Sequence, residues 1–533
     1  MEKTEENDDS RIQLSKYTIA LLENLKLIKS KPQPDETSRI TVSQTASFFA
    51  LAYEKIRNAV EYRESHLIRK SAIDRMIRRR LALNPEAKGE AENLIRELLW
   101  ARYFSNESLG IEDVSNVQNI IDKYLFVKKT ISASYSEFVF DLMVCEIEEV
   151  LSPAEAKRNS LFTFFLYQVL KNKVKMDPLT EEQKNIAFYV ALEKTYSKSD
   201  TAYLRFHLFA LSHKPFSQMA KHELSEITSE LPVLFDQIDK TMKTPSPRSL
   251  NRFIKNQSPP FLILFEIMKR HSPDRARKTL EYKKPLWQEV WTVCKEKYSQ
   301  TQGKLTSLAI RAIIYIFVTK MIFALILEYP VSLYIYNEVN YTSLAINSLF
   351  PPFLMFLIIA LTRLPNEQNT KRINERLIDI VDADKSFETS ISFVVRKVQT
   401  KRPVLVFFFT IFYLFTFFAT FNLLHLTLNV LRFNMISQIV FVFFVSLVAF
   451  FSYRISQIAK EYKLREKESF FQPFADFFFL PFLSVGKFFS TNLARLNFFG
   501  VLFDFFIEAP FKIIVEVIEE WVNFARSKRE EIA

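Results

Sequence analysis

The chain has 533 residues, with 54 phenylalanines, 5 glycines and a formal net charge of +11. Glycine supplies the positive-φ positions of hairpin turns, so its depletion excludes a β-rich fold, and both glycine-rich phosphate-binding motifs are missing. The basic residues cluster beside apolar runs, which favours a membrane over nucleic acid as their partner and predicts an all-α integral membrane protein.

Residues 1–37 are expected to hold one amphipathic helix followed by a proline linker. The first residues, MEKTEENDDSRIQ, are acidic and polar, whereas a secretory signal has a basic start and an apolar core. Apolar residues recur at helical spacing from Leu14 to Ile28, and Pro32 and Pro34 then break the pattern. This end of the chain is therefore predicted on the cytoplasmic side.

Residues 38–300 are predicted to form a cytoplasmic α-helical domain, because helical periodicity runs through nearly the whole segment. Capping patterns mark several helix starts: Ser152-Pro153, Thr180 with Gln183, and Ser272-Pro273. The stretches TPSPRS (244–249) and NQSPP (256–260) predict a looser connection. Cys145 and Cys294 have no metal-site spacing and are expected in the core.

A strongly basic stretch, RESHLIRKSAIDRMIRRRL, occupies residues 63–81. Its seven cationic side chains are Arg63, Arg69, Lys70, Arg75, Arg78, Arg79 and Arg80. On one helix they are candidates for contact with anionic lipid headgroups. RNA phosphates would suit the same charges, but no aromatic residues are interleaved for base stacking. A solvated, salt-bridged helix face is the alternative interpretation.

Four segments are predicted to cross a membrane, at 305–336, 339–363, 403–431 and 433–456. A helix needs about 20 apolar residues to cross the hydrocarbon layer. The last three segments contain runs of 24, 29 and 21 residues without Asp, Glu, Lys or Arg. The first carries Arg311, Lys320 and Glu328 but is otherwise densely apolar, and Arg311 is placed to snorkel from the helix end.

The distribution of positive charge predicts the orientation of these spans. Nine Lys and Arg residues lie in 363–402, and none lies in 329–340. Because cytoplasmic loops are enriched in Lys and Arg, residues 364–401 are predicted as a charged cytoplasmic loop with an amphipathic helix. Four spans then place both termini in the cytoplasm, and a plasma or inner membrane is the expected location.

The Phe-rich segment 469–509 includes ADFFFLPFLSVGKFFSTNLARLNFFGVLFDFF, in which charges limit the longest uncharged run to ten residues. A run of that length suits a helix lying in the membrane interface, which is our prediction. A re-entrant hairpin or two further half-spans are the alternatives. Residues 510–533 are predicted as a C-terminal amphipathic helix that Pro510 opens.

The strongest candidate for a functional site is an intramembrane polar group of Lys320, Asn347, Pro351 and Pro352. Lys320 lies nine residues after Arg311, about 13.5 Å along a helix, which places it near the middle of the bilayer. The other three spans offer it no acidic partner, and Asp504 or Glu508 reaches it only if the Phe-rich segment enters the bundle. The two prolines leave helix carbonyls unpaired. Snorkelling or structural pairing of Lys320, and simple kinks or late helix starts at the prolines, are the alternatives.

These patterns contain no catalytic constellation, cofactor motif or metal-ligand spacing, and pairs such as Glu148-Glu149 read as helix surface. The prediction is therefore a membrane-anchored scaffold or assembly component, whose partners are the lipid bilayer and other proteins or further copies of itself. The alternative is a transporter or channel subunit that uses Lys320 and the Pro351-Pro352 break. An enzyme is the least supported class.

Overall fold

The computed structural model describes residues 11–28, 31–32, 34–43, 47, 54, 64–176, 179–243, 248–362, 364–382, 393–395, 403–464, 479–489, 517, 521 and 524. These residues are predominantly helical, which confirms the all-α prediction. Contacts divide the chain into two units. Unit 1 comprises Met1–Lys16, Asn256–Ile391 and Arg396–Phe499, and unit 2 comprises Tyr17–Lys255, Ser392–Val395 and Gly500–Ala533.

Unit 2 is an array of helices with one short pair of parallel strands, β1 (Val174–Met176) and β2 (Phe393–Val395). Its described helices are α1 (Lys16–Lys26, which begins in unit 1), α3 (Ser65–Leu83), α4 (Glu90–Trp100), α5 (Ile111–Thr130), α6 (Ser136–Leu151), α7 (Pro153–Leu170), α8 (Glu181–Thr195), α9 (Thr201–Ala210), α10 (Lys221–Ile227) and α11 (Leu231–Lys243). Short 3-10 turns at Ala133–Tyr135, Lys171–Lys173 and Phe216–Gln218 join some of them.

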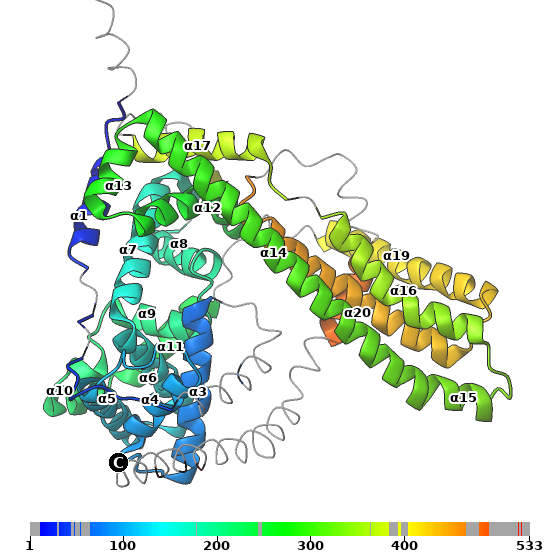
Figure 1. Cartoon of the computed structure of the whole chain (residues 1–533), viewed down its shortest axis with the longest axis horizontal. Coiled ribbons are helices and arrows are strands. Elements are labelled where there is room, and N and C mark those ends of the chain that lie inside the picture. The colour runs from blue at the N-terminus through cyan, green and yellow to red at the C-terminus, as the bar shows by residue number, and fades with distance from the viewer. Residues whose placement is uncertain are drawn as a thin grey trace, which may run out of the picture. The chain divides into compact units, whose positions relative to one another are not determined.

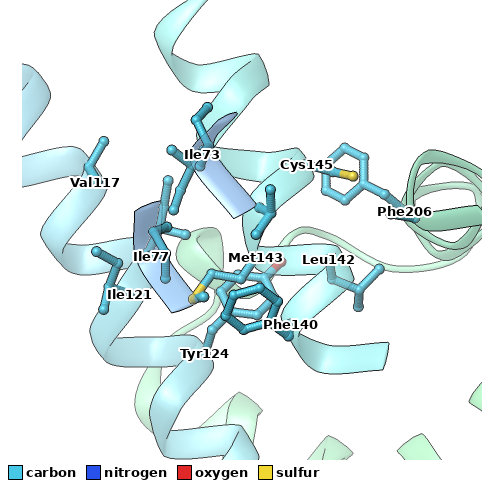
Figure 2. Packing of buried hydrophobic residues seen from close by; sticks show 14 of the residues in the cluster. Ile73, Ile77, Val117, Ile121, Tyr124, Phe140, Leu142, Met143, Cys145 and Phe206 are labelled. Carbon is cyan, nitrogen blue, oxygen red and sulfur yellow. The ribbon is translucent and has the colours of Figure 1, made fainter. Parts of the chain in front are cut away.

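The core of unit 2 surrounds α6, which contacts α3, α5, α7 and α9. Figure 2 shows Ile73 of α3, Ile121 of α5 and Met143 of α6 in one buried cluster. Cys145 lies in the same cluster and Cys294 is buried in unit 1, which confirms that both are core residues.

The predicted helix starts are confirmed. Ser152 and Ser272 are N-caps that a proline follows in the first turn, and Thr180 forms a capping box with Gln183. In that capping box the Thr180 hydroxyl accepts from the Gln183 backbone N–H at 3.3 Å, and the Gln183 side chain accepts from the Thr180 backbone N–H at 3.3 Å. The Thr180 capping box satisfies N–H groups that have no partner inside the helix, whereas the Ser152 and Ser272 side chains form no cap hydrogen bond.

The predicted loose connection at 256–260 is wrong, because helix α12 (Arg248–Arg270) continues through Pro259 and Pro260. Each proline removes one helix hydrogen bond and clashes with the preceding turn, at a cost of about 3 kcal/mol. The residues after them include Phe261, Ile263 and Leu264, which are fully buried. Burying side chains of this size stabilises by about 1.5–3 kcal/mol each, which offsets the two breaks.

Unit 1 contains the apolar helices. Its described elements after α12 are α13 (Pro273–Leu280), α14 (Lys283–Phe323), a π-helical turn (Ala324–Glu328), α15 (Tyr329–Tyr334), α16 (Tyr341–Ala360), α17 (Glu367–Val381), α19 (Pro403–Val430), α20 (Met435–Ala459) and the helix Phe479–Phe489. Among the described residues, four stretches are long and apolar enough to cross a membrane: Lys283–Tyr334, Tyr341–Ala360, Phe407–Val430 and Met435–Ala459.

The first of these stretches starts well before the predicted span 305–336. Helix α14 runs without interruption from its polar part, which contacts α13 and α17, into its apolar part, which contacts α16 and α20 (Figure 1). Leu305 and Ile316 of α14 pack with Met355 of α16 and Phe444 of α20 in a core between these helices. The membrane-length helices α14, α16 and α20 are thus joined by a shared apolar core.

Candidate functional site

The polar residue predicted at the centre of the first span, Lys320, forms a buried ion pair. Its Nζ donates to Glu328 Oε1, and both side chains have 0% exposed surface. The sequence suggested Asp504 or Glu508 as the nearest acidic partners, and both lie outside the described residues. The observed partner lies instead on the same helical stretch, eight residues later.

The π-helical turn Ala324–Glu328 explains how the two charges meet. In a regular α-helix, at about 100° per residue, residues eight positions apart lie about 80° apart around the axis. A π-turn contains about one extra residue, so it rotates the next part of the helix back by about 100° and brings Glu328 under Lys320. Pro330 favours such a turn, because it has no N–H and its ring clashes with the carbonyl of Ile326.

Asn347 of α16 completes this site. Its Nδ2 donates to Glu328 Oε2 at 2.5 Å and to the backbone carbonyl of Ser437 in α20 at 3.1 Å. Its Oδ1 has no hydrogen-bond partner among the described residues, although the side chain is fully buried. The Lys320 ammonium also lies 5.2 Å from the ring centre of Phe444, a favourable cation–π distance. The site therefore connects the first, second and fourth apolar stretches.

The two predicted prolines lie one turn further along the same helix. Pro351 and Pro352 are buried inside α16, four residues after Asn347 and Ser348. Because proline has no N–H, the carbonyls of Asn347 and Ser348 lose their usual helix partners. The structure thus brings Lys320 and Asn347 together through Glu328, and it places the proline break directly beside them.

A second polar cluster, which the sequence did not reveal, lies where α19 turns into α20. His425 Nδ1 is 2.6 Å from Gln438 Oε1, and Gln438 Nε2 donates to Asn429 Oδ1 at 2.6 Å. Asn429 Nδ2 lies 3.0 Å from His425 Nε2, which closes a ring of three side chains. Asn434 Nδ2 donates to the Ser332 hydroxyl at 2.8 Å and ties this turn to α15.

The basic stretch at 63–81 is held by acidic partners. The ion pairs are Arg69 with Glu148 and Glu155, Lys70 with Asp200, Arg75 with Glu54, Arg78 with Asp74 and Glu137, Arg79 with Glu97, and Arg80 with Glu90 and Glu97. Arg63 lies outside the described residues. Pairing of this kind matches the alternative interpretation of a salt-bridged helix face, and contact with anionic lipid stays a prediction.

One interpretation of the acidic residues is wrong, because Glu148 is buried rather than on the helix surface. Arg69 Nε donates to Glu148 Oε1 at 2.8 Å, and the Tyr203 hydroxyl donates to Oε2 at 2.7 Å. Burial raises the pKa of Glu148, and the Arg69 charge and these hydrogen bonds oppose that rise. Helix α6 is central in unit 2, so its polar positions face neighbouring helices and need partners there.

His207 of α9 also lies between two carboxylates. Its Nδ1 is 3.2 Å from Glu193 Oε2, and its Nε2 is 3.3 Å from Glu149 Oε1. Burial disfavours the charged imidazole, but the two carboxylates outweigh that effect and raise the pKa of His207 to about 10. His207 is therefore an imidazolium at neutral pH, and the sequence showed no sign of this because its partners lie 14 and 58 positions away.

Comparison with models of protein families, with curated proteins and with solved structures found no match. Among the residues that the structure describes, no group of three or more His, Cys, Asp or Glu side chains is placed to hold a metal ion. The described residues define a class: a helical protein with four helices of membrane-spanning length and a buried ion pair on the first of them.

Proposed function

We propose that the protein is a multi-pass membrane protein that acts as a membrane-anchored scaffold or assembly component. The observation that carries this proposal is the complete enclosure of Lys320 and Glu328 among apolar helices. Charged side chains inside a bilayer are costly and are retained there only when paired or functional. Because Glu328 also accepts a hydrogen bond from Asn347 of α16, this buried group links the first apolar stretch to the second.

The case for a membrane rests on where the apolar side chains point. In the most apolar window of the Phe407–Val430 helix only 6% of the residues are buried, against 50% for Met435–Ala459. Phe408, Phe415 and Phe418 of α19 each expose more than three fifths of their surface. Water would solvate such a face poorly, whereas lipid chains solvate it well, and helices of 20 residues or more match the hydrocarbon thickness.

The orientation and the scaffold role are inferred from charge and from burial. The Lys and Arg bias places both termini on the cytoplasmic side of a plasma or inner membrane. The bilayer is one partner in this proposal. Unit 2 offers a large helical surface for the others, which are proteins or further copies of the chain. The basic side chains of α3 are engaged in ion pairs within this unit, for example Arg69 with Glu148 and Arg79 with Glu97.

A transporter or channel subunit is the second candidate function, and one specific observation favours it. The Asn347 Oδ1 is a buried acceptor without a partner among the described residues, and it belongs to the side chain that binds Glu328. The proline break in α16 adds unpaired carbonyls one turn away. Oxygen atoms of this kind bind cations in transporters with broken helices.

Two measurements on the full-length chain test these proposals. Labelling of Asn337→Cys in intact cells or vesicles is expected to occur on the side opposite to a tag at residue 1, and labelling on the same side would overturn the topology. Purification in mild detergent is expected to give a stoichiometric complex with partner proteins. A lone homo-oligomer that carries ion flux in proteoliposomes, with the flux lost in Lys320→Met, would replace the scaffold by the transporter.

A further inference from the structure

We propose that the helix Phe479–Phe489 is a re-entrant segment, held near the middle of the bilayer against α19 and α20. The inference rests on the proposed membrane placement of unit 1 and changes the expected interfacial position of the Phe-rich segment. Of the segment 469–509, the structure describes residues 479–489 only. The proposal concerns this helix, and three kinds of contact carry it.

The first contact is a close crossing of two backbones at Gly486. A Cβ atom on Gly486 would overlap the Ser446 carbonyl oxygen of α20 and lie 2.8 Å from the Phe450 Cβ. Gly486 is buried, and its missing side chain lets the helix lie directly on α20. Close crossings through small residues are typical of helices that associate inside membranes, where apolar burial gives no driving force between helices.

The second and third contacts fix the rest of the helix. The Ser484 hydroxyl lies 3.0 Å from the Tyr413 hydroxyl of α19, within hydrogen-bond distance. The ring of Phe482 lies 5.4 Å from that of Phe421 in α19, and the ring of Phe489 lies 4.8 Å from that of Phe443 in α20. The helix therefore contacts both α19 and α20, from Phe482 in its first turn to its last residue.

The positions of these partners along the spans give the depth. The uncharged runs 403–431 and 433–453 have residues 417 and 443 at their centres. Tyr413 and Phe421 are each four residues from the first centre, and Ser446 is three residues from the second. At about 1.5 Å per residue, these contact positions lie within about 6 Å of the middle of a layer whose half-thickness is about 15 Å.

The length of the helix and its exposed charge complete the argument. The described helix of 11 residues is about 16 Å long, short of a layer of about 30 Å, and in the proposed topology, with both termini on the cytoplasmic side, the chain enters and leaves on that side. The residue after Gly486 is Lys487, whose side chain is exposed. An interfacial helix would keep this ammonium in water, so the depth of its neighbour Phe488 decides between the two placements.

A spin label at Phe488→Cys, in the full chain reconstituted into vesicles, measures that depth through its accessibility to oxygen and to a water-soluble nickel complex. This variant keeps Lys487, and the Phe488 side chain is 63% exposed. Labels at Phe418→Cys, next to the centre of α19, and at Lys460→Cys, at the end of α20, provide the deep and shallow references. The native cysteines are buried.

The expected result is a depth at 488 close to that at 418. A depth at 488 close to that at 460, with 418 deep, would overturn this inference and leave the membrane proposal intact. An aqueous reading at 418 would overturn the membrane proposal itself. The two failures are therefore distinguishable in one series of samples.

A glycine pair gives an independent test of the crossing. Gly486→Ala places a methyl group on the Ser446 carbonyl, whereas Gly303→Ala, on α14, meets nothing within 4 Å. With the label at 488, Gly486→Ala is expected to increase label mobility and change its depth, and Gly303→Ala is expected to change neither. Unchanged spectra for Gly486→Ala would overturn the proposed crossing.

Discussion

The side chain of Asn369 donates to the backbone carbonyl of Tyr462 at 2.8 Å, and thereby ties the start of α17 to the chain just after α20. The same Nδ2 group donates to the Tyr298 hydroxyl of α14 at 2.8 Å, and the Oδ1 atom accepts from the Leu464 backbone N–H at 2.9 Å. One buried amide thus connects three segments of unit 1 at the end where the apolar helices begin.

Asn369→Leu is therefore expected to destabilise unit 1. The substitution removes the hydrogen bonds of Asn369 to the Tyr462 carbonyl and the Leu464 N–H, and each such bond contributes about 0.5–1.5 kcal/mol. Thermal unfolding of the full-length protein in detergent should show a lower midpoint than the wild type. Gln302→Ala, at an exposed position of α14, is the control and should leave the midpoint unchanged. Equal midpoints for all three proteins would remove Asn369 from this role.

The buried pair of Lys320 and Glu328 predicts non-additive effects of substitution. Lys320→Met leaves a buried carboxylate without its cation, and breaking a buried pair costs about 3–5 kcal/mol. Lys320→Met/Glu328→Met removes both charges, so the double variant should be more stable than either single one. A double-mutant cycle of unfolding midpoints measures the coupling, and additive losses would contradict the pairing.

The π-turn predicts opposite responses to deletion and insertion. Deleting Ile326, an exposed residue of the turn, leaves Lys320 and Glu328 seven positions apart, about 20° from alignment in a regular helix. Inserting one alanine after Ile326 puts the two charges about 180° apart. The deletion should therefore keep most of the folded yield, and the insertion should abolish it. Similar yields, measured by monodisperse recovery in detergent, would refute this role of the turn.

His207 predicts a loss of stability at alkaline pH. Its pKa is about 10 in the folded state against a reference value of 6.5, so its contribution is complete below pH 6.5 and is lost as pH rises through 10. His207→Gln should lower the unfolding midpoint of unit 2 strongly at pH 6.5 and weakly at pH 10. The exposed His222→Gln is the control at both pH values. A gap that stays constant between the two pH values would contradict the ion pairs with Glu193 and Glu149.

The apolar helices were predictable because their signal is local. A long run without charges, such as 403–431, is enough by itself to predict an apolar helix of membrane-spanning length. The caps at Ser152, Thr180 and Ser272 are equally local, since a few adjacent residues determine them. Helix α12 shows the limit of such rules, because tertiary burial carried the helix through two prolines that read as a break.

The polar sites were predictable only in part, because they depend on contacts that sequence spacing does not show. Lys320 and Asn347 were identified by their place in apolar runs, but Glu328 was missed because regular helical geometry points it elsewhere. Glu148 was read as surface because its partner Arg69 lies 79 positions away. Such pairs emerge only when the packing of the helices is known.

Helix α14 continues without a break from its polar half into its apolar half. The length of the polar half therefore determines how far α13 lies from the apolar half. From Lys283 to Ile310 it has 28 residues, so this half is about 40 Å long, far more than the headgroup layer is thick. In the proposed orientation, an α14 perpendicular to the membrane holds α13 about 40 Å from the apolar half of the helix, in the aqueous phase. A molecule that docks on α13 would work out of reach of the lipid headgroups, while its recruitment still confines it to the membrane.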